Sequence, residues 1–233
     1  MIRTLVLFLA LVVCPAAADA QSFASIFTQL PKDFSRLAQP SNVMILGSTG
    51  VGSLALLAKD DEIAQQVHDP DDFFAAGDLL GEGWTHAAAG LSVYVTGRVM
   101  GNTELGGLGS DLLRAQMVSG IITDGLKLVT NRARPDGGPH SFPSGHTSSA
   151  FASAAVLHGH FGWKVGVPSY VVATYVASSR MALNRHFITE VVFGAGIGIA
   201  SGWATTFHVR DTTIRIAPTV TPGSAAVNVS VIN

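Results

Sequence analysis

The chain has 233 residues, of which 48% are hydrophobic and only 13% are charged, and its mean hydropathy is +0.38. The formal net charge of −2 argues against a nucleic-acid-binding protein, because binding to a phosphate backbone needs a basic face. The length allows one large domain or two small ones, and the apolar composition requires either a deep helical core or contact with a membrane.

The first twenty residues have the form of a signal peptide. Residues 1–3 are a short positive start, residues 5–13 are an apolar run, and residues 18–20 have the small-x-small form of a signal-peptidase site. The run is too short to span a membrane comfortably, so we predict cleavage after Ala20. The only cysteine, Cys14, would leave with this segment, which excludes disulfides and Cys–zinc sites from the mature chain. Export without cysteine favours a bacterial periplasm.

Residues 21–42 contain Pro31 and Pro40, and we expect them to form an irregular lead-in with at most one short helix. A series of apolar stretches rich in Ala, Gly and Ser follows, separated by clusters of Gly, Pro, Asp and Asn. Because these stretches are too long for strands, residues 43–207 predict an all-α helical bundle. The stretches cover residues 43–58, 72–100, 111–131, 146–160, 165–180 and 187–206.

The distribution of charge bears on whether this bundle lies in a membrane. The stretch 111–131 carries four charged residues, which suits a lipid-facing helix poorly. Only 165–180 and 187–206 approach the length and apolarity of a spanning helix, and the second contains Glu190. The sequence therefore favours a soluble or membrane-peripheral bundle over one that crosses the membrane repeatedly.

The tail, residues 208–233, has a different residue pattern from the helical stretches before it. Residues 213–220 and 225–231 alternate with period two around the turn at 221–224, which predicts a β-hairpin. An isolated hairpin is marginally stable in water, so we expect it to dock on the bundle or on a partner.

Lys127 and Arg134 stand seven residues apart, close to two helical turns, so both side chains can emerge on one face of a helix. Pro135 follows and is expected to end that helix and to begin a loop. Two such cations can point together at an anion, the arginine with its planar fork of donors. An isolated pair of this kind is more often two solvated surface cations.

Pro143, Ser144, Gly145 and His146 open the next helical stretch. Ser144 is placed to cap this helix, whose first amide groups then form a site for an anion. Gly145 lets the backbone approach a ligand closely, and His146 at the mouth of the site can donate a proton to a leaving oxygen. Taken alone, the segment also fits an ordinary capped helix.

His186 and Glu190 stand four residues apart, so Glu190 can accept a hydrogen bond from one imidazole nitrogen and leave the other free to attack. Arg180 lies six residues before His186, a spacing that does not share one face of a straight helix, so we predict a break near residues 183–185. Surface His–Glu pairs are common and stabilise little, so this segment is also ambiguous by itself.

In this order the three segments resemble the type 2 phosphatidic acid phosphatase (PAP2) superfamily, which includes bacterial non-specific acid phosphatases and vanadium haloperoxidases. The family pattern is Lys-x6-Arg-Pro, then Pro-Ser-Gly-His, then Ser-Arg-x5-His-x3-Asp. Residues 127–190 match this pattern except at its last position, where Glu190 stands in place of Asp. The resemblance implies an all-α bundle over residues 43–207, of the exported bacterial phosphatase branch.

By that resemblance His186 is the nucleophile that forms a phosphohistidine, and Glu190 takes the place of the carboxylate that orients it. His146 protonates the leaving group and then activates water. The extra methylene of Glu190 either shifts His186 or is absorbed by a small backbone change. No metal or other cofactor is implied, because cations and amides supply the charge stabilisation. The residues expected to hold the phosphoryl oxygens are Lys127, Arg134 and Arg180, with backbone donors from Ser144 and Gly145.

The sequence therefore predicts a phosphatase that hydrolyses phosphomonoesters or pyrophosphates, on a lipid phosphate, a polyprenyl pyrophosphate or a small ester. Two alternatives stay open. A vanadium-dependent haloperoxidase would use the same cage for vanadate, although those family members are typically much longer. A non-catalytic phosphate-binding module would result if Glu190 weakened the nucleophile. We expect a periplasmic protein with peripheral membrane contact.

Overall fold

The computed structural model describes residues 22–69, 71–206, 213–221 and 224–232, so the predicted signal peptide and its cleavage site lie outside the described residues. The helices in chain order are α2 (Phe23–Thr28), α3 (Leu30–Arg36), α4 (Pro40–Leu56), α5 (Asp60–Val67), α6 (Ala76–Gly81), α7 (Gly83–Met100), α8 (Thr103–Thr130), α9 (Gly145–Phe161), α10 (Trp163–Ala182) and α11 (Ile188–Thr205). Short 3-10 helices, η1 (Leu57–Lys59) and η2 (Asp72–Phe74), precede α5 and α6, and two strands, β1 (Thr213–Thr221) and β2 (Ser224–Ile232), follow α11.

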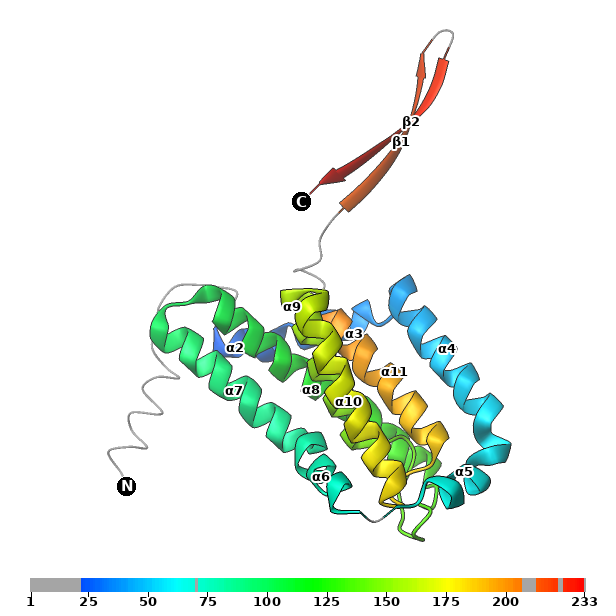
Figure 1. Ribbon diagram of the computed structural model, residues 1–233. Coiled ribbons are helices and arrows are strands. Elements are labelled where there is room, and N and C mark those ends of the chain that lie inside the picture. The colour runs from blue at the N-terminus through cyan, green and yellow to red at the C-terminus, as the bar shows by residue number, and fades with distance from the viewer. Residues whose placement is uncertain (1–21, 70, 207–212, 222–223, 233) are drawn as a thin grey trace.

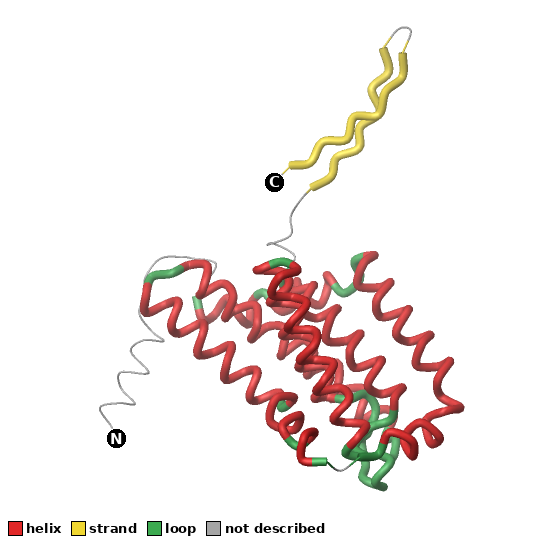
Figure 2. The backbone as a smooth tube through the Cα atoms, viewed as in Figure 1, coloured by secondary structure: helices red, strands yellow, loops and turns green. Residues whose placement is uncertain are grey.

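The predicted all-α fold is confirmed (Figure 1, Figure 2). The six apolar stretches correspond to α4, α7, α8, α9, α10 and α11, with α6 beginning the second of them. The strands β1 and β2 pair antiparallel with Thr221 opposite Ser224, which is the predicted hairpin. Docking of the hairpin stays a prediction, because residues 207–212, which join it to α11, lie outside the described residues.

The lead-in over residues 21–42 is helical, which differs from the irregular segment that we expected. The Ser22 side chain caps α2 by accepting a hydrogen bond from the Ser25 amide at 3.2 Å. Pro31 lies in the first turn of α3 and Pro40 is the first residue of α4. Proline is tolerated at these positions, where the missing amide would have no intrahelical acceptor, so both prolines begin helices instead of breaking them.

The helix α9 lies at the centre of the bundle, in contact with α7, α8, α10 and α11, while α4 packs mainly on α11 at the edge (Figure 1). Glycines allow the closest approaches. An added methyl group at Gly198 or Gly202 of α11 would overlap backbone atoms of α9. A methyl group at Gly109 of α8 would likewise overlap the backbone of Tyr94 in α7. The short distances between these helices therefore depend on glycine, which has no side chain.

Small residues fill the interior, and large apolar ones face outward. Ala115, Ala152 and Ala200 are fully buried, whereas Met44 and Leu54 of α4 are 72% and 73% exposed. The buried residues of α4 are Asn42 and Ser53, which are polar. Two helical segments are long and apolar enough to cross a membrane, Pro40–Val67 with 11% of its apolar window buried and Ile188–Thr205 with 67% buried. Apolar surface of this extent marks contact with something other than water.

Two of the four charged residues in 111–131, Asp111 and Arg114, point into the bundle, whereas Asp124 is exposed. Arg114 of α8 donates to Asp33 of α3 at 2.5 Å, to Asp111, and to the Thr205 carbonyl at 3.0 Å. His160 of α9 lies 2.9 Å from the second oxygen of Asp111. These groups neutralise one another away from the surface, as buried charges must. Asp111 and Arg114 therefore do not count against contact of α8 with lipid, whereas the exposed Asp124 still does.

We expect Gly109→Ala to destabilise the fold, because its methyl group would force α7 and α8 apart. Overpacking of this kind costs about 1–3 kcal/mol. Gly120 is the matched control, since it lies in the same helix with no atom within 4 Å of an added Cβ. Gly120→Ala should leave the free energy of unfolding unchanged or raise it by up to about 1 kcal/mol. Urea unfolding in detergent, followed by circular dichroism, measures both, and equal effects would contradict the packing argument.

Candidate active site

Four helix ends meet at one end of the bundle and carry the predicted site residues. The chain reverses between α8 and α9, between α9 and α10, and between α10 and α11, so the C-terminal ends of α8 and α10 lie beside the N-terminal ends of α9 and α11. The loops 131–144 and 183–187 complete this end. All eight predicted residues fall within these helix ends and loops.

The helix α8 ends earlier than we predicted. Its last residue is Thr130, and Asn131 closes it in the left-handed conformation with φ of 41°. Lys127 is therefore in the last turn of α8, while Arg134 lies in the loop, so the expected shared helical face is wrong. The loop is held by the Arg134 amide, which donates to the Gly138 carbonyl at 2.7 Å. The two cations reach one site from a helix and from a loop. The predicted break between Arg180 and His186 is present, because α10 ends at Ala182 and Asn184 has φ of 56°.

Glu190 organises the loop that carries His186. Its Oε2 atom accepts hydrogen bonds from Nδ1 of His186 at 2.8 Å, from the Phe187 amide at 3.2 Å and from the Ser141 hydroxyl. Glu190 is the third residue of α11, and a glutamate at this position commonly reaches back to the residue that caps the helix. The longer side chain is thus accommodated by capping α11 while it faces the imidazole.

The arrangement fixes the tautomer of His186. A carboxylate only accepts, so we assign the imidazole proton to Nδ1, which leaves Nε2 as the unprotonated nitrogen. No hydrogen bond from a described residue reaches Nε2. Burial, together with the charges of Lys127 and Arg180, lowers the pKa of His186 to about 4, although Glu190 opposes this effect. The imidazole is therefore neutral near pH 7 and can act as a nucleophile.

Three cations surround the two histidines. Burial lowers the pKa of Lys127, and the charge of Arg134 adds to this effect. Lys127 and Arg134 act electrostatically on His146, and Lys127 and Arg180 act on His186. The Nε atoms of Arg134 and Arg180 are buried without a hydrogen-bond acceptor among the described residues. Buried donors of this kind normally have partners, so both groups are candidates for contact with an anionic ligand.

The N-terminus of α9 differs in one respect from the prediction. The Ser144 side chain accepts from the amide and the hydroxyl of Thr147, which confirms it as the cap. Its own amide, however, donates to the Glu190 carbonyl at 3.1 Å, so that amide is not available to a ligand. Gly145 remains in place as a backbone donor, and an added Cβ there would lie 3.8 Å from Nζ of Lys127. The helix N-terminus and the lysine therefore face the same small space.

The short helix α6 covers this end and supplies acidic residues that the sequence did not indicate. Asp78 pairs with Arg180, and Oε1 of Glu82, just after α6, lies 3.3 Å from Nε2 of His146. Gly81 permits this contact, because a side chain there would overlap His146. Burial lowers the pKa of His146, Glu82 opposes that effect, and Lys127 and Arg134 add to it.

Three further residues around Glu190 were not predicted from the sequence. Ser141 contacts Glu190 from the loop, Arg132 lies 3.5 Å from the second carboxylate oxygen, and Asp60 binds Arg132 from α5. Arg132 stands two residues before Arg134, so its position in the motif was a usable signal. No signal in the sequence pointed to Asp60, because it lies far from the motif. Among the described residues, no three or more His, Cys, Asp or Glu side chains lie together as metal ligands do.

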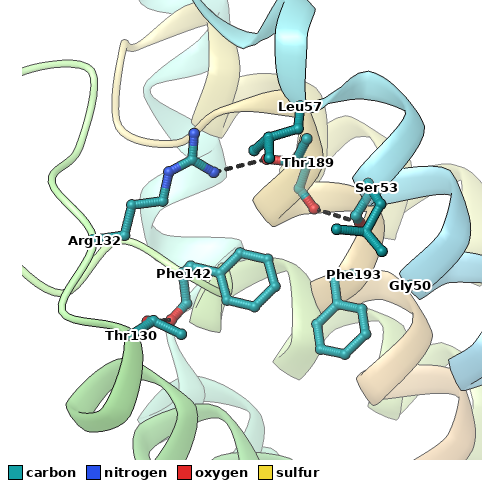
Figure 3. Close-up of a pocket in the computed structure, with 9 residues that line it drawn as sticks. Gly50, Ser53, Leu57, Thr130, Arg132, Phe142, Thr189 and Phe193 are labelled. Carbon is teal, nitrogen blue, oxygen red and sulfur yellow. Dashed lines mark hydrogen bonds between the residues drawn. The ribbon is translucent and has the colours of Figure 1, made fainter.

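A cavity of about 520 Å³ adjoins the site on the side of α4 and α11 (Figure 3). It begins beside the motif residues, because Phe142 precedes Pro143 and Thr189 precedes Glu190. Phe142 and Phe193 stack on each other with ring centroids 5.2 Å apart. Its lining is mostly apolar, with Arg132 as the charged residue, and comprises Gly50, Ser53, Leu54, Leu57, Thr130, Arg132, Phe142, Thr189 and Phe193.

Comparison with known families agrees with this geometry. The family model of the PAP2 superfamily matches residues 109–213, which include every predicted site residue. This part of the chain belongs to the PAP2 superfamily, as the sequence motifs predicted.

Two relatives carry names that describe enzymes. A lipid A 1-phosphatase from Porphyromonas gingivalis is 38% identical over 112 residues, which is 45% of this chain and 25% of that protein. A lipid A 4'-phosphatase from Helicobacter pylori is 29% identical over 132 residues, which is 52% of this chain and 65% of that protein. The chain thus matches less than two thirds of the length of either relative.

Two solved structures share the fold. LpxE from Aquifex aeolicus superposes with a TM-score of 0.52 at 23% identity, covering 62% of this chain and 91% of that one. A transmembrane PAP2-type phosphatidylglycerolphosphate phosphatase from Bacillus subtilis superposes with a TM-score of 0.56 at 20% identity, covering 82% of this chain and 98% of that one. The likeness extends beyond the motif region to the helices that precede it.

We expect Glu82→Gln to lower the pKa of His146 further, because the variant loses the one carboxylate that favours the charged imidazole. The change should be small, since Glu82 is half-exposed and its charge is screened by water. An NMR titration of the imidazole nitrogens measures this pKa directly. Glu104→Gln, at the opposite end of α8, is the control and should leave the titration unchanged. An unshifted His146 in Glu82→Gln would mean that the pair does not form in solution.

Proposed function

We propose that this protein is a phosphatase that hydrolyses a phosphate ester or pyrophosphate through a phosphohistidine at His186. The observation that carries the proposal is the buried contact of 2.8 Å between Nδ1 of His186 and Glu190. It leaves Nε2 without a hydrogen bond from a described residue, on an imidazole whose pKa responds to the charges of Lys127 and Arg180. Membership of the PAP2 superfamily and the names of the two relatives support the same reaction class.

In the first step, Nε2 of His186 attacks the phosphorus atom and forms a P–N bond while the bond to the leaving oxygen breaks. His146 gives its proton to that oxygen, so the product leaves as an alcohol or a phosphate. The imidazole gains positive charge, which Glu190 stabilises through Nδ1–H. Lys127, Arg134 and Arg180 stabilise the charge on the phosphoryl oxygens.

In the second step, a water molecule attacks the phosphohistidine and the P–N bond breaks. His146, now neutral, takes the proton of the water, and His186 returns to its neutral form. Inorganic phosphate is released, and the histidines recover their starting protonation states. Charge stabilisation comes from side chains and backbone amides throughout, so the mechanism uses no metal.

We propose a phosphorylated lipid as the substrate, with a lipid A-type glycolipid as the first candidate. The two relatives are named for lipid A, and the apolar cavity beside the site suits an acyl chain (Figure 3). The exposed apolar residues of α4 and α10 support contact of the protein with a membrane, where such substrates reside. Export to the periplasm remains part of this proposal.

His186→Ala is expected to reduce phosphate release by about 10³-fold or more, because no P–N bond can form. Release of inorganic phosphate should be measured in detergent micelles from lipid A, phosphatidylglycerol phosphate, a polyprenyl pyrophosphate and a small aryl phosphate. A higher kcat/KM for the lipids than for the aryl phosphate supports a lipid substrate. His158→Ala is the control, since His158 lies in the last turn of α9, at the opposite end of that helix from His146, and should retain activity. Substantial turnover by His186→Ala would refute the mechanism.

The pH dependence of kcat/KM should be bell-shaped, with its optimum on the acid side of neutrality. The nucleophile is the neutral imidazole, and the pKa of His186 is lowered to about 4, so activity is retained above that pH and falls below it. The proton donor is the charged form of His146, whose pKa is lowered from its ordinary value, so activity falls again as pH rises through that pKa. Initial rates on a soluble ester from pH 3 to 9 test both limbs; an optimum above pH 8 would contradict the assignment.

A further inference from the structure

One oxygen of the Glu190 carboxylate accepts hydrogen bonds, and the other accepts none from the described residues. Oε2 accepts the three hydrogen bonds from His186, Phe187 and Ser141. Oε1 is buried and accepts no hydrogen bond, and its nearest cation is Nη1 of Arg132 at 3.5 Å. Glu190 is completely buried, so a carboxylate oxygen without a counter-charge would be costly there. Arg132 is the group that meets this oxygen.

Arg132 is itself held rigidly from several sides. Its Nη2 donates to Asp60 at 2.7 Å, and its Nη1 donates to the Thr189 hydroxyl at 2.9 Å (Figure 3). Its guanidinium carbon lies 4.5 Å from the centre of the Phe187 ring. The carbonyl of Arg132 also accepts from the Ser141 amide at 2.9 Å, so Arg132 places the backbone of the residue whose hydroxyl contacts Glu190. An arginine fixed by this many contacts has one orientation.

Asp60 completes the arrangement from the N-terminal half of the chain. It is almost fully buried at the start of α5 and accepts from the Thr189 hydroxyl at 2.7 Å and from the Thr189 amide at 3.2 Å. Thr189 is the second residue of α11, so Asp60 caps this helix in place of Phe187, whose side chain cannot accept a hydrogen bond. Asp60 therefore fixes the first turn of α11, which carries Glu190, as well as Arg132.

We propose that Arg132 and Asp60 are positioning residues that hold Glu190 with only Oε2 turned toward His186. This inference rests on the proposed function, because it assigns the residues a role in the reaction of His186. Neither is one of the residues that define the three motifs, although Arg132 lies between Lys127 and Arg134, and Asp60 lies outside residues 109–213. Glutamate is one methylene longer than the aspartate of the family pattern and therefore has more rotamers to choose from. The Arg132–Asp60 pair selects one of them.

The first test measures the geometry without using activity. Nitrogen-15 NMR of His186 reports which ring nitrogen carries the proton. The wild-type protein should show almost only the Nδ1–H tautomer. In Arg132→Gln and in Asp60→Asn, a clear fraction of the Nε2–H tautomer should appear, because Glu190 no longer faces Nδ1 in one orientation. Unchanged tautomer populations in both variants would overturn the proposal, whatever the protein's activity.

The second test separates positioning from substrate binding and from stability. Arg132→Gln should lower kcat by roughly 10- to 100-fold with KM changed less than about two-fold, as expected when an orienting partner is lost. Arg36→Gln is the matched control, since it removes an arginine that pairs with Asp33 at the far end of the bundle; we expect a lower melting temperature and unchanged kcat. A higher KM with unchanged kcat would make Arg132 a substrate-binding residue and overturn the proposal.

The third test asks whether Arg132 acts through Glu190. Glu190→Asp has a carboxylate too short to contact both Arg132 and His186, so the double variant Arg132→Gln/Glu190→Asp should be no slower than the Glu190→Asp variant alone. Multiplied losses in the double variant would mean that Arg132 acts independently, which contradicts the proposal. If wild-type protein and His186→Ala both lack turnover, the proposed function fails, and the NMR experiment still decides the geometry.

Discussion

The buried carboxylate of Glu190 is the constraint on which this end of the molecule depends. Its Oε2 atom orients His186, caps α11 through the Phe187 amide and binds Ser141 of the loop 131–144. Its backbone carbonyl accepts from the Ser144 amide, which fixes the start of α9. One residue thus joins the start of α11 to the segment 141–144, which is more than forty residues away in sequence. A buried charge is tolerated only when its partners are in place, so the site and the local fold must form together.

The distribution of residue size and charge explains how such a site can sit beside apolar surroundings. The interior is rich in Ala, Gly, Ser and Thr, which let helices approach closely, beside core residues such as Leu108 and Val156, and many large apolar residues face outward. Interfaces between membrane helices use small residues in the same way, because backbone approach and packing replace the hydrophobic effect. Charged groups pair inside, at the Arg114 network and at the site. The outer surface is therefore apolar, as the proposed contact with lipid requires, and polar groups lie inside, as the proposed phosphate site requires.

The sequence was sufficient for the class of fold and for the pairing of His186 with Glu190, because helix length and residue spacing are local patterns. Helical stretches and motif spacing led to the six long helices, to the His186–Glu190 pair and to the break after Arg180. The sequence was insufficient where the backbone conformation of one residue decides where a helix ends. Asn131 adopts the left-handed conformation and ends α8, so Arg134 lies in a loop and not in the helix. It also failed for contacts across long separations, since nothing near Asp60, Asp78 or Glu82 pointed to their partners.

Those three acidic residues give the N-terminal half of the chain a definite part in the site. Asp60 meets Arg132 and the start of α11, Asp78 meets Arg180 at the end of α10, and Glu82 meets His146 in the first turn of α9. Each binds a cation or a histidine on a different one of the helix ends that form the site, and all three lie outside residues 109–213. The match to the family covers the groups proposed to react, whereas the charges that balance and orient them come from α5 and α6. Because a buried cation or imidazole changes its behaviour with each nearby carboxylate, relatives that share the three motifs can differ in chemistry through these preceding helices alone.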